Sequence, residues 1–359
     1  MQKIKILFNA WADHDNTNAQ SLNARDIAVR LDPRRFESAF FALGEPKPEL
    51  NHKPHIKIIK IPRRLGSLVM AAQMVWGAYD LIYYPPLRRQ RKLFNLLKVG
   101  GKKKSTVFPI EAIAQQILAV DPAARQEILQ VLFGSEARYA ISSNIATTME
   151  EKFGLLMKVI PLGVDTQAFS FIDRRKHTLP AKILTLATIQ PRKQTHLILD
   201  LAQHIQPERA DFHIFGNILG DPAYYSMLLQ RKADQALTNV HFHGKVLHGD
   251  LPRLLQNFDI FVLPSRLEGV PRITLEAAAS GMPCVIFDDY QSPSVVDGIT
   301  GFQVQTLAQM VERLEMLVEN KELRLEMGAN AAMYIKKFDW EVLIKLYEGF
   351  FEALVMSRS

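Results

Sequence analysis

The stretch from Phe258 to Pro283 constrains the fold of this chain more than any other part of the sequence. Phe258 to Leu263 is an apolar run with a single charge, which is typical of a strand buried on both faces. Pro264 ends that strand, Pro271 stands where a helix tolerates proline in its first turn, and Gly281 marks the end of the helix. The stretch therefore predicts a buried strand, a short loop and a helix, in that order.

Two carboxylates flank the start of the predicted helix. Glu268 falls in the loop at the carboxyl end of the strand, and Glu276 falls on the helix itself. The backbone amides from Val270 to Ile273 have no partner inside the helix, so they form a partly positive pocket suited to phosphate. A carboxylate on each side of an anion pocket fits a ligand that carries hydroxyls as well as phosphates. A sugar nucleotide carries both, and we take it as the ligand hypothesis.

The alternation of strand and helix runs through the chain in two series. Its 359 residues exceed one comfortable core, so two domains are the default. The first series begins at Ile4 to Asn9, and the second begins at Ile183 to Ala187 after a polar bridge over residues 173–180. This pattern predicts an α/β fold of two doubly wound domains, over residues 1–170 and 171–337, followed by a helix over 338–359.

The formal net charge of +7 is distributed unevenly. Residues 1–170 hold 24 Lys and Arg against 15 Asp and Glu, whereas residues 171–359 hold 20 against 22. A basic half predicts an anionic partner, although a solvated basic face gives the same composition. The segment from Arg88 to Lys104 has the composition of an exposed helix packed on its domain or of an amphipathic segment on an anionic membrane surface. With less support, it fits a nucleic-acid-binding element. Its basic residues are Arg88, Arg89, Arg91, Lys92, Lys98, Lys102, Lys103 and Lys104.

Three further features bear on the compartment. The first residues predict a strand rather than a signal peptide, because polar residues follow at once. The apolar stretch from Leu65 to Tyr79 is too short to span a bilayer and contains glycine. The single cysteine, Cys284, excludes an internal disulfide and sits in an apolar run typical of a buried strand. We expect a cytoplasmic protein.

The ends of the other strands in the second series carry groups that suit a sugar nucleotide. Thr188 to Lys193 follows the first strand and places Arg192 and Lys193 where a diphosphate would be clamped. Gly216-Asn217 follows the second strand as a tight turn that lets a ligand approach the backbone, and Val246 lies in the loop after the third. His241 and His243 share one face of that third strand, as metal ligands do. Because no third ligand is near them in sequence, both are interpreted as structural, and no metal site is predicted.

Taken together, these residues resemble glycosyltransferase family 4, which comprises retaining enzymes of the GT-B fold. The family signature is two glutamates separated by seven residues, and Glu268 to Glu276 matches it in spacing and context. Ile160 to Asp165 and Val296 to Gly301 also match, and the resemblance covers residues 140–350. It implies that residues 1–170 bind the acceptor, that residues 171–337 bind a nucleotide sugar across a cleft, and that the last helix crosses back to the first domain.

The resemblance also assigns roles to residues. Glu268 would contact the donor sugar, Glu276 the ribose hydroxyls, and Lys193, helped by Arg192, would neutralise the diphosphate leaving group. Thr188 stands where the family usually has arginine, and Gln194 where it usually has glycine. The remaining donor contacts would come from Gly269, Val270, Pro271, Arg272, Ile273, Thr274, Thr188, Gly216, Asn217 and Val246, and the acceptor would pass Asn16, Asn18, Gln20 and Glu111.

We therefore expect a retaining glycosyltransferase that moves a sugar from a UDP- or GDP-linked donor to a glycan or lipid-linked acceptor, without a metal or another cofactor. A nucleotide-sugar epimerase or a phosphorylase of the same architecture remains an alternative. So does a non-catalytic protein that binds sugar nucleotides or a membrane surface. A phosphorylase needs a lysine that carries pyridoxal phosphate, and the sequence singles none out.

Overall fold

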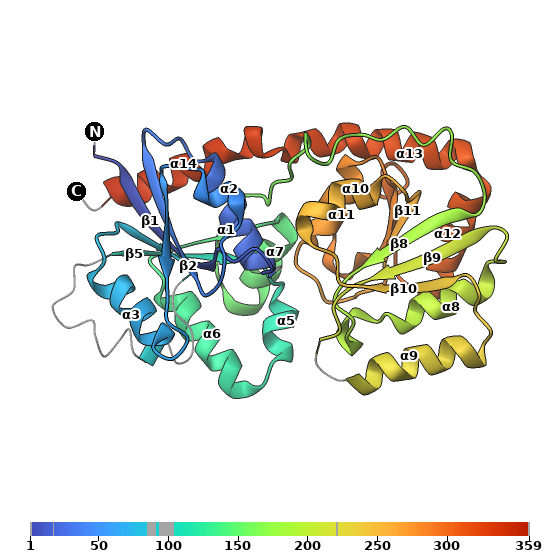
Figure 1. Ribbon diagram of the computed structural model, residues 1–359, viewed down its shortest axis with the longest axis horizontal. Helices are drawn as coiled ribbons and strands as arrows, with labels where there is room; N and C mark the ends of the chain where they lie inside the picture. The colour runs from blue at the N-terminus through green and yellow to red at the C-terminus, as the bar shows by residue number, and fades with distance from the viewer. Residues whose placement is uncertain (1, 17, 85–90, 93–103, 220–221, 358–359) are drawn as a thin grey trace. The chain divides into compact units, whose positions relative to one another are not determined.

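The computed structural model describes residues 2–16, 18–84, 91–92, 104–219 and 222–357. The chain divides into two compact units (Figure 1). The first unit contains residues 1–162 together with 341–359, and the second contains residues 163–340. Each unit has a parallel sheet of its own, so the two doubly wound α/β domains expected from the sequence are present.

The first unit is built on seven parallel strands in the order β3-β2-β1-β4-β5-β6-β7, which reverses direction between β1 and β4. The strands are β1 (Ile4–Trp11), β2 (Phe36–Ala42), β3 (Ile56–Lys60), β4 (Leu81–Tyr83), β5 (Ser105–Ile110), β6 (Ala137–Ala140) and β7 (Lys158–Val159). The helices are α1 (Ala19–Arg30), α2 (Pro48–Asn51), α3 (Gly66–Trp76), α5 (Ala114–Ala119), α6 (Pro122–Gly134), α7 (Ser143–Phe153) and α14 (Trp340–Met356).

Apolar side chains fix the helices of this unit to its sheet. Met70 and Met74 of α3 pack against Leu7, Phe41 and Ile82 from three neighbouring strands, and all five are buried. Removing such side chains from water is the main driving force for this arrangement.

The last helix, α14, packs on the same unit through aromatic residues. The ring of Tyr347 meets that of Tyr139 edge-on at 5.8 Å, and Phe351 meets Phe36 at 6.4 Å. The hydroxyl of Tyr347 donates a hydrogen bond to the Pro161 carbonyl at 3.0 Å. The end of the chain is therefore part of the core of the first unit.

The second unit has six parallel strands in the order β10-β9-β8-β11-β12-β13, which reverses direction between β8 and β11. The strands are β8 (Ala181–Leu186), β9 (Ala210–Phe215), β10 (Val240–Gly244), β11 (Ile260–Leu263), β12 (Cys284–Phe287) and β13 (Gly301–Val304). The helices are η1 (Pro191–Lys193), α8 (His196–His204), α9 (Pro222–Asp234), η2 (His248–Asp250), α10 (Leu251–Leu255), α11 (Arg272–Ala279), η3 (Asp288–Tyr290), α12 (Leu307–Glu319), α13 (Lys321–Tyr334) and η4 (Ile335–Phe338).

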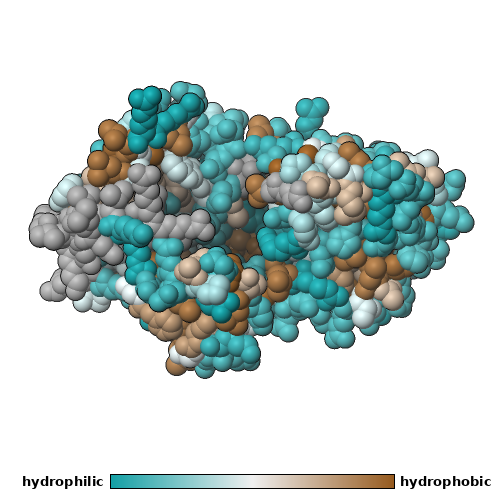
Figure 2. All heavy atoms as spheres, turned by 90° about the horizontal axis from the view of Figure 1, so that it is seen from below, coloured by the Kyte–Doolittle hydropathy of each residue, from teal (hydrophilic) through white to brown (hydrophobic). Residues whose placement is uncertain are grey.

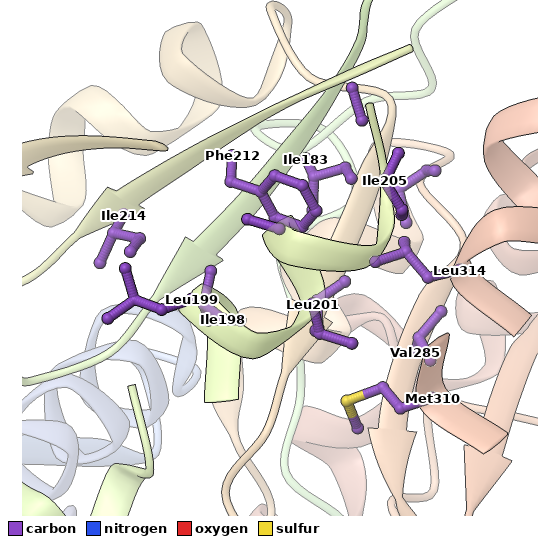
Figure 3. Packing of buried hydrophobic residues seen from close by; sticks show 14 of the residues in the cluster. Ile183, Ile198, Leu199, Leu201, Ile205, Phe212, Ile214, Val285, Met310 and Leu314 are labelled. Atoms are coloured by element: carbon purple, nitrogen blue, oxygen red, sulfur yellow. The ribbon is translucent and has the colours of Figure 1, made fainter. Parts of the chain in front are cut away.

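One hydrophobic cluster fills the space between this sheet and the helices α8, α9 and α12. Figure 3 shows Ile198 and Leu201 of α8 beside Ile183 and Phe212 of the strands, with Leu314 reaching in from α12. The helix α12 begins at a capping box in which Thr306 and Gln309 satisfy each other's backbone amides. This packing fixes the sheet whose strands β8 and β11 carry the loops of the candidate site.

The boundary between the units differs from the boundary expected at residues 170 and 171. The chain enters the second unit at Gly163, and a Cβ at that position would lie 2.4 Å from the Trp340 ring. Val164 also exchanges backbone hydrogen bonds with Phe338 and Trp340. These contacts tie Gly163 and Val164 to the end of the second unit.

Hydrophilic and hydrophobic side chains are interspersed over the face that Figure 2 shows. Among the described residues, no helix is both long enough and apolar enough to cross a membrane. In the basic segment, Arg91 donates to the Glu127 carbonyl at 3.4 Å and Lys104 donates to the Val75 carbonyl at 2.5 Å, while Lys92 is exposed. Arg88, Arg89, Lys98, Lys102 and Lys103 lie outside the described residues.

Candidate active site

The candidate site lies where the order of the second sheet reverses. In an open parallel sheet, the loops after two neighbouring strands that continue in opposite directions leave a crevice at the carboxyl edge. Here those strands are β8 and β11, which pair directly. The loop after β8 carries Arg192 and Lys193, and the loop after β11 carries Glu268. The two predicted parts of the site therefore come from adjacent strands.

The structure brings Lys193 and Glu268 into direct contact. Lys193 Nζ lies 2.5 Å from Glu268 Oε1, and the two side chains are only 16% and 9% exposed. Arg192 donates to the Leu267 carbonyl at 2.7 Å and lies 3.5 Å from the same carboxylate oxygen, with 45% of its side chain exposed. Two cations and one carboxylate thus meet at one point of the sheet edge.

The environment of Lys193 disfavours the charged form of its side chain. Burial lowers the pKa of Lys193 below its ordinary value, and the neighbouring Glu268 carboxylate acts in the opposite direction. Glu268 is also held by the buried hydroxyl of Ser265, which donates to Oε1. A lysine in such a place is poorly solvated, so an incoming anion would stabilise it strongly.

The helix after this loop begins as the sequence predicts. Pro271 occupies the N-cap of α11, and Arg272 is its first residue. The helix runs over eight residues, and the side chains of Ile273 and Val270 are buried. The first backbone amides of a helix have no partner within it and carry partial positive charge, so the anion pocket over Val270 to Ile273 stays a prediction that this helix start is compatible with.

Glu276 lies on the second turn of α11 and is only 3% exposed. His248 Nε2, from the 3₁₀ helix after β10, is 2.7 Å from Glu276 Oε1, and Arg272 NH2 is 3.6 Å from the same oxygen. The carboxylate is therefore held between two basic side chains. A buried carboxylate in a fixed orientation suits hydrogen bonds to ligand hydroxyls.

Thr274, expected as a donor contact, has its side chain inside the unit. Its hydroxyl donates to the Pro271 carbonyl at 2.7 Å and accepts from Ser294 at 2.8 Å. The residue is fully buried, so its hydroxyl stabilises the start of α11 and the loop after β12. Gly269 is also buried in the loop that carries Glu268.

The loop after β9 explains Gly216 differently from the sequence interpretation. A Cβ on Gly216 would lie 1.8 Å from the Ala187 carbonyl oxygen, so the close approach that requires glycine is to the chain's own backbone. Ile189 donates to the Asn217 carbonyl at 2.8 Å, which joins the loops after β8 and β9. Thr188 accepts from the Gln190 side chain at 2.9 Å, and Val246 is half-buried after β10.

The residues predicted to contact the acceptor lie in the first unit and form different contacts there. Asn18 is the N-cap of α1, where its side chain accepts from the amides of Gln20 and Ser21. The Asn16 side chain accepts from the Asn18 amide at 2.9 Å, and buried Arg25 donates to the Asn16 carbonyl at 2.5 Å. These hydrogen bonds of Asn16 and Asn18 therefore stabilise the conformation of the loop. The Gln20 side chain is exposed.

Glu111 lies directly after β5 and forms a small polar cluster. Its Oε1 accepts from the Tyr84 hydroxyl at 2.5 Å and from Asn23 Nδ2 at 2.8 Å. Burial and the nearby carboxylate raise the pKa of Tyr84 well above its ordinary value, which keeps it a proton donor. Tyr84 also has a positive φ of 60°, an uncommon conformation for a bulky residue. The cluster sits where the first sheet reverses, between β1 and β4.

Sequence reasoning missed three partners of the predicted residues. Ser265 lies in the stretch from Phe258 to Pro283 but was given no role, and His248 and Tyr84 carry no sequence signal beyond their distance from a strand end. Each becomes visible only when the fold brings a separate loop to the same edge.

Residues 169–333 match the family model described as glycosyl transferases group 1. The chain is 27% identical over 155 residues to a Campylobacter jejuni N,N'-diacetylbacillosaminyl-diphospho-undecaprenol alpha-1,3-N-acetylgalactosaminyltransferase, covering 40% of this chain and 41% of that relative. It is 29% identical over 372 residues to a D-inositol 3-phosphate glycosyltransferase of an Arthrobacter species, covering 90% of this chain and 85% of the relative. The match thus spans less than half of the Campylobacter protein and most of the Arthrobacter one.

Among solved structures, the chain is similar to Anabaena Alr3699/HepE in complex with UDP and glucose. The TM-score is 0.78 at 19% identity, and the alignment covers 97% of this chain and 99% of the other. At that identity the likeness establishes the fold, which agrees with the two parallel-sheet units and with the GT-B class. Residues 169–333, which carry the Lys193–Glu268 pair and Glu276, thus match the glycosyl transferases group 1 model within a chain of the GT-B fold.

Proposed function

We propose that this protein is a retaining glycosyltransferase that takes a sugar from a UDP- or GDP-linked donor. The contact between Lys193 and Glu268 carries the proposal, because a poorly solvated cation and a carboxylate that would bind the sugar meet at one point of the sheet edge. The match of this domain to group 1 glycosyltransferases supports the reaction class. The UDP and glucose in the Anabaena structure support a nucleotide-sugar ligand.

The Lys193–Glu268 pair suggests how the donor engages the site. A diphosphate carries more charge than the Glu268 carboxylate, so it would draw Lys193 and Arg192 toward itself. Glu268, still held by Ser265, would then turn its oxygens to the hydroxyls of the sugar. Donor binding would in this way replace one ion pair by a set of contacts to the ligand, which limits the cost of desolvating the lysine.

The chemical step then follows from where charge develops. As the bond between the sugar and the diphosphate breaks, positive charge grows on the sugar ring and negative charge grows on the leaving oxygen. Lys193, Arg192 and the first amides of α11 would stabilise the leaving group, and they would do so more strongly in the transition state than in the bound donor. Glu276 would bind the ribose hydroxyls and hold the nucleotide in place.

We assign the acceptor to the first unit. The Glu111, Tyr84 and Asn23 cluster offers a carboxylate and a tyrosine hydroxyl at the reversal point of that sheet. A glycan hydroxyl, free or on a lipid carrier, is the acceptor chemistry that such a cluster recognises. Asn16, Asn18 and Gln20 would border it through the loop before α1.

The test measures donor binding and turnover in the same protein. Wild-type protein is screened by thermal shift against UDP, GDP, UDP-glucose and GDP-mannose, and release of free nucleotide is followed for each donor that raises the melting temperature. We expect one nucleotide class to stabilise the protein. Lys193→Ala should slow nucleotide release by about 100-fold, because it removes a charge that stabilises the leaving group. Glu268→Ala should lower both binding and release.

Exposed residues of the same unit provide matched controls. Lys176→Ala and Glu208→Ala remove the same side chains at exposed positions and should match wild type in both assays. If a donor binds but no nucleotide is released with any glycan or lipid acceptor, and Lys193→Ala only weakens binding, the protein is a sugar-nucleotide-binding protein and the proposal fails. Conversion of the donor to its epimer without transfer would identify an epimerase.

A further inference from the structure

Three histidines and an aspartate gather on one face of the second sheet, away from the loops that carry Lys193 and Glu268. Asp211 and His213 lie on β9, and His241 and His243 lie on β10. The strands pair in parallel with His241 opposite His213. Alternate residues of a strand point to the same face, so the register places all four side chains together. β10 is the edge strand, which leaves the group accessible.

The distances suit a single small cation. His241 Nε2 is 3.4 Å from Asp211 Oδ1, and one ligand atom from each of Asp211, His213 and His241 lies within 4.8 Å of the others. Nitrogen and oxygen ligands bind Zn²⁺ at about 2.0–2.2 Å, so two ligands of a tetrahedral ion are roughly 3.4 Å apart. The three atoms need only small side-chain rotations to reach that spacing.

His213 is oriented as a metal-binding histidine is. Its Nδ1 is 2.9 Å from His243 Nε2, which leaves its other ring nitrogen available to a ligand. That nitrogen, Nε2, is shielded from solvent and has no hydrogen-bond partner within the described residues. Metal-bound histidines characteristically use one ring nitrogen for the metal and the other for a hydrogen bond that fixes the ring.

The surroundings hold the rings in place. Phe215 stacks on His243 at 4.4 Å, and Phe258 meets His213 edge-on at 5.2 Å. Lys182 of β8 pairs in register with Asp211 of β9 and is exposed to solvent.

We propose that Asp211, His213 and His241 bind a divalent transition-metal ion, with Zn²⁺ as the best fit, and that His243 holds His213 by a hydrogen bond. Two imidazoles and one carboxylate match the ligand preference of Zn²⁺, and a water would complete the tetrahedron. The ion would cross-link the edge strand β10 to β9. The site is distinct from the proposed donor site because its ligands lie within the strands rather than in the loops that follow β8 and β11.

The test uses the full chain without an affinity tag, freed of metal by a chelator and dialysed. We expect one Zn²⁺ per chain by elemental analysis after equilibrium dialysis, and a rise in melting temperature on adding Zn²⁺. Co²⁺ should give the intense visible absorption of a tetrahedral site. Asp211→Asn and His241→Gln, which change partly exposed side chains, should each weaken Zn²⁺ binding by at least 10-fold and abolish the Co²⁺ band.

His204→Gln is the matched control, because His204 is an exposed histidine of the same unit that lies at the end of α8. Circular dichroism of each variant without metal shows whether the fold is kept. If folded His241→Gln and His204→Gln bind Zn²⁺ as tightly as wild type, the binding is unspecific and the proposal fails. Absence of Zn²⁺ binding to wild type at micromolar concentrations would overturn it as well.

Discussion

Lys193 Nζ and Glu268 Oε1 lie 2.5 Å apart, although 74 residues stand between them in the sequence. The contact exists because β8 and β11 are neighbours in the sheet and their following loops meet at its edge. Burial destabilises the charged form of Lys193, and the Glu268 carboxylate offsets part of this cost. A ligand whose anionic group attracts the lysine more strongly than the Glu268 carboxylate does can break this ion pair.

The first prediction concerns the stability of this pair. Glu268→Gln should destabilise the protein by about 2–3 kcal/mol at pH 7, because it leaves a largely buried cation without a counter-charge. The pKa of Lys193 would then fall further below its ordinary value. A base whose pKa is lowered on folding gains stability as pH rises through the interval between the two values. Urea unfolding should therefore show the deficit of Glu268→Gln shrinking between pH 7 and pH 9.5.

The double variant Lys193→Met with Glu268→Gln provides the control. Removing the lysine charge as well should restore at least half of the lost stability. A double variant as unstable as Glu268→Gln, at every pH, would show that the loss comes from Ser265 or from packing and not from the unpaired lysine.

The second prediction separates a ligand role of Glu276 from a structural one. Glu276→Gln keeps the shape of the side chain but removes its charge, so a hydrogen bond to a ribose hydroxyl would lose about 1.5 kcal/mol. We expect the affinity for the nucleotide to fall about 10-fold in isothermal titration calorimetry. Inorganic pyrophosphate, which has no ribose, should bind the variant and wild type equally. Equal loss for both ligands would assign Glu276 to holding His248 and Arg272 instead.

The third prediction follows from the backbone contact at Gly216. Gly216→Ala would force a methyl group against the Ala187 carbonyl and should destabilise the protein by about 2–4 kcal/mol in urea unfolding. Gly249→Ala is the matched control, since a Cβ there meets nothing within 4 Å and the residue is not at positive φ. Its free energy of unfolding should stay within about 0.5 kcal/mol of wild type. Similar free energies of unfolding for both variants would mean that the loop after β9 adapts to the added methyl group.

The fourth prediction is a gain in stability. Gly349 lies in the interior of α14 on its exposed side, and a Cβ there would meet nothing within 4 Å. Alanine is favoured over glycine in a helix interior by about 0.5–1 kcal/mol. Gly349→Ala should therefore raise the free energy of unfolding by that amount and leave nucleotide binding unchanged. A decrease would show that α14 meets a neighbour at this position in solution.

The sequence predicts the local parts of the site well. The positions of Glu268 in a loop and Glu276 on a helix follow from an apolar run and two prolines, and the structure places both there. Both features depend on residues within one short segment, where spacing and turn chemistry decide the conformation. The order of helices and strands over the chain is likewise encoded locally, which is why two α/β units could be expected.

Contacts between segments were harder to foresee. His213 and Asp211 complete the group of His241 only because β9 and β10 pair with one particular register, and spacing along one strand cannot reveal it. Asn18 illustrates the reverse case. Its polar loop suggested a ligand, but its side chain caps α1, a use that Asn serves equally well.

The packing of α14 on β-strand residues of the first unit has a consequence for how the chain is made. The second unit is one uninterrupted stretch of chain, whereas the first is completed only by residues 341–359. Synthesis proceeds from the amino terminus, so residues 1–162 are made long before the helix that completes their unit. Until α14 emerges, Tyr139 and Phe36 have no aromatic partner from that helix and remain open to water or to a chaperone. The unit whose translation begins first is thus the one whose last helix is translated last.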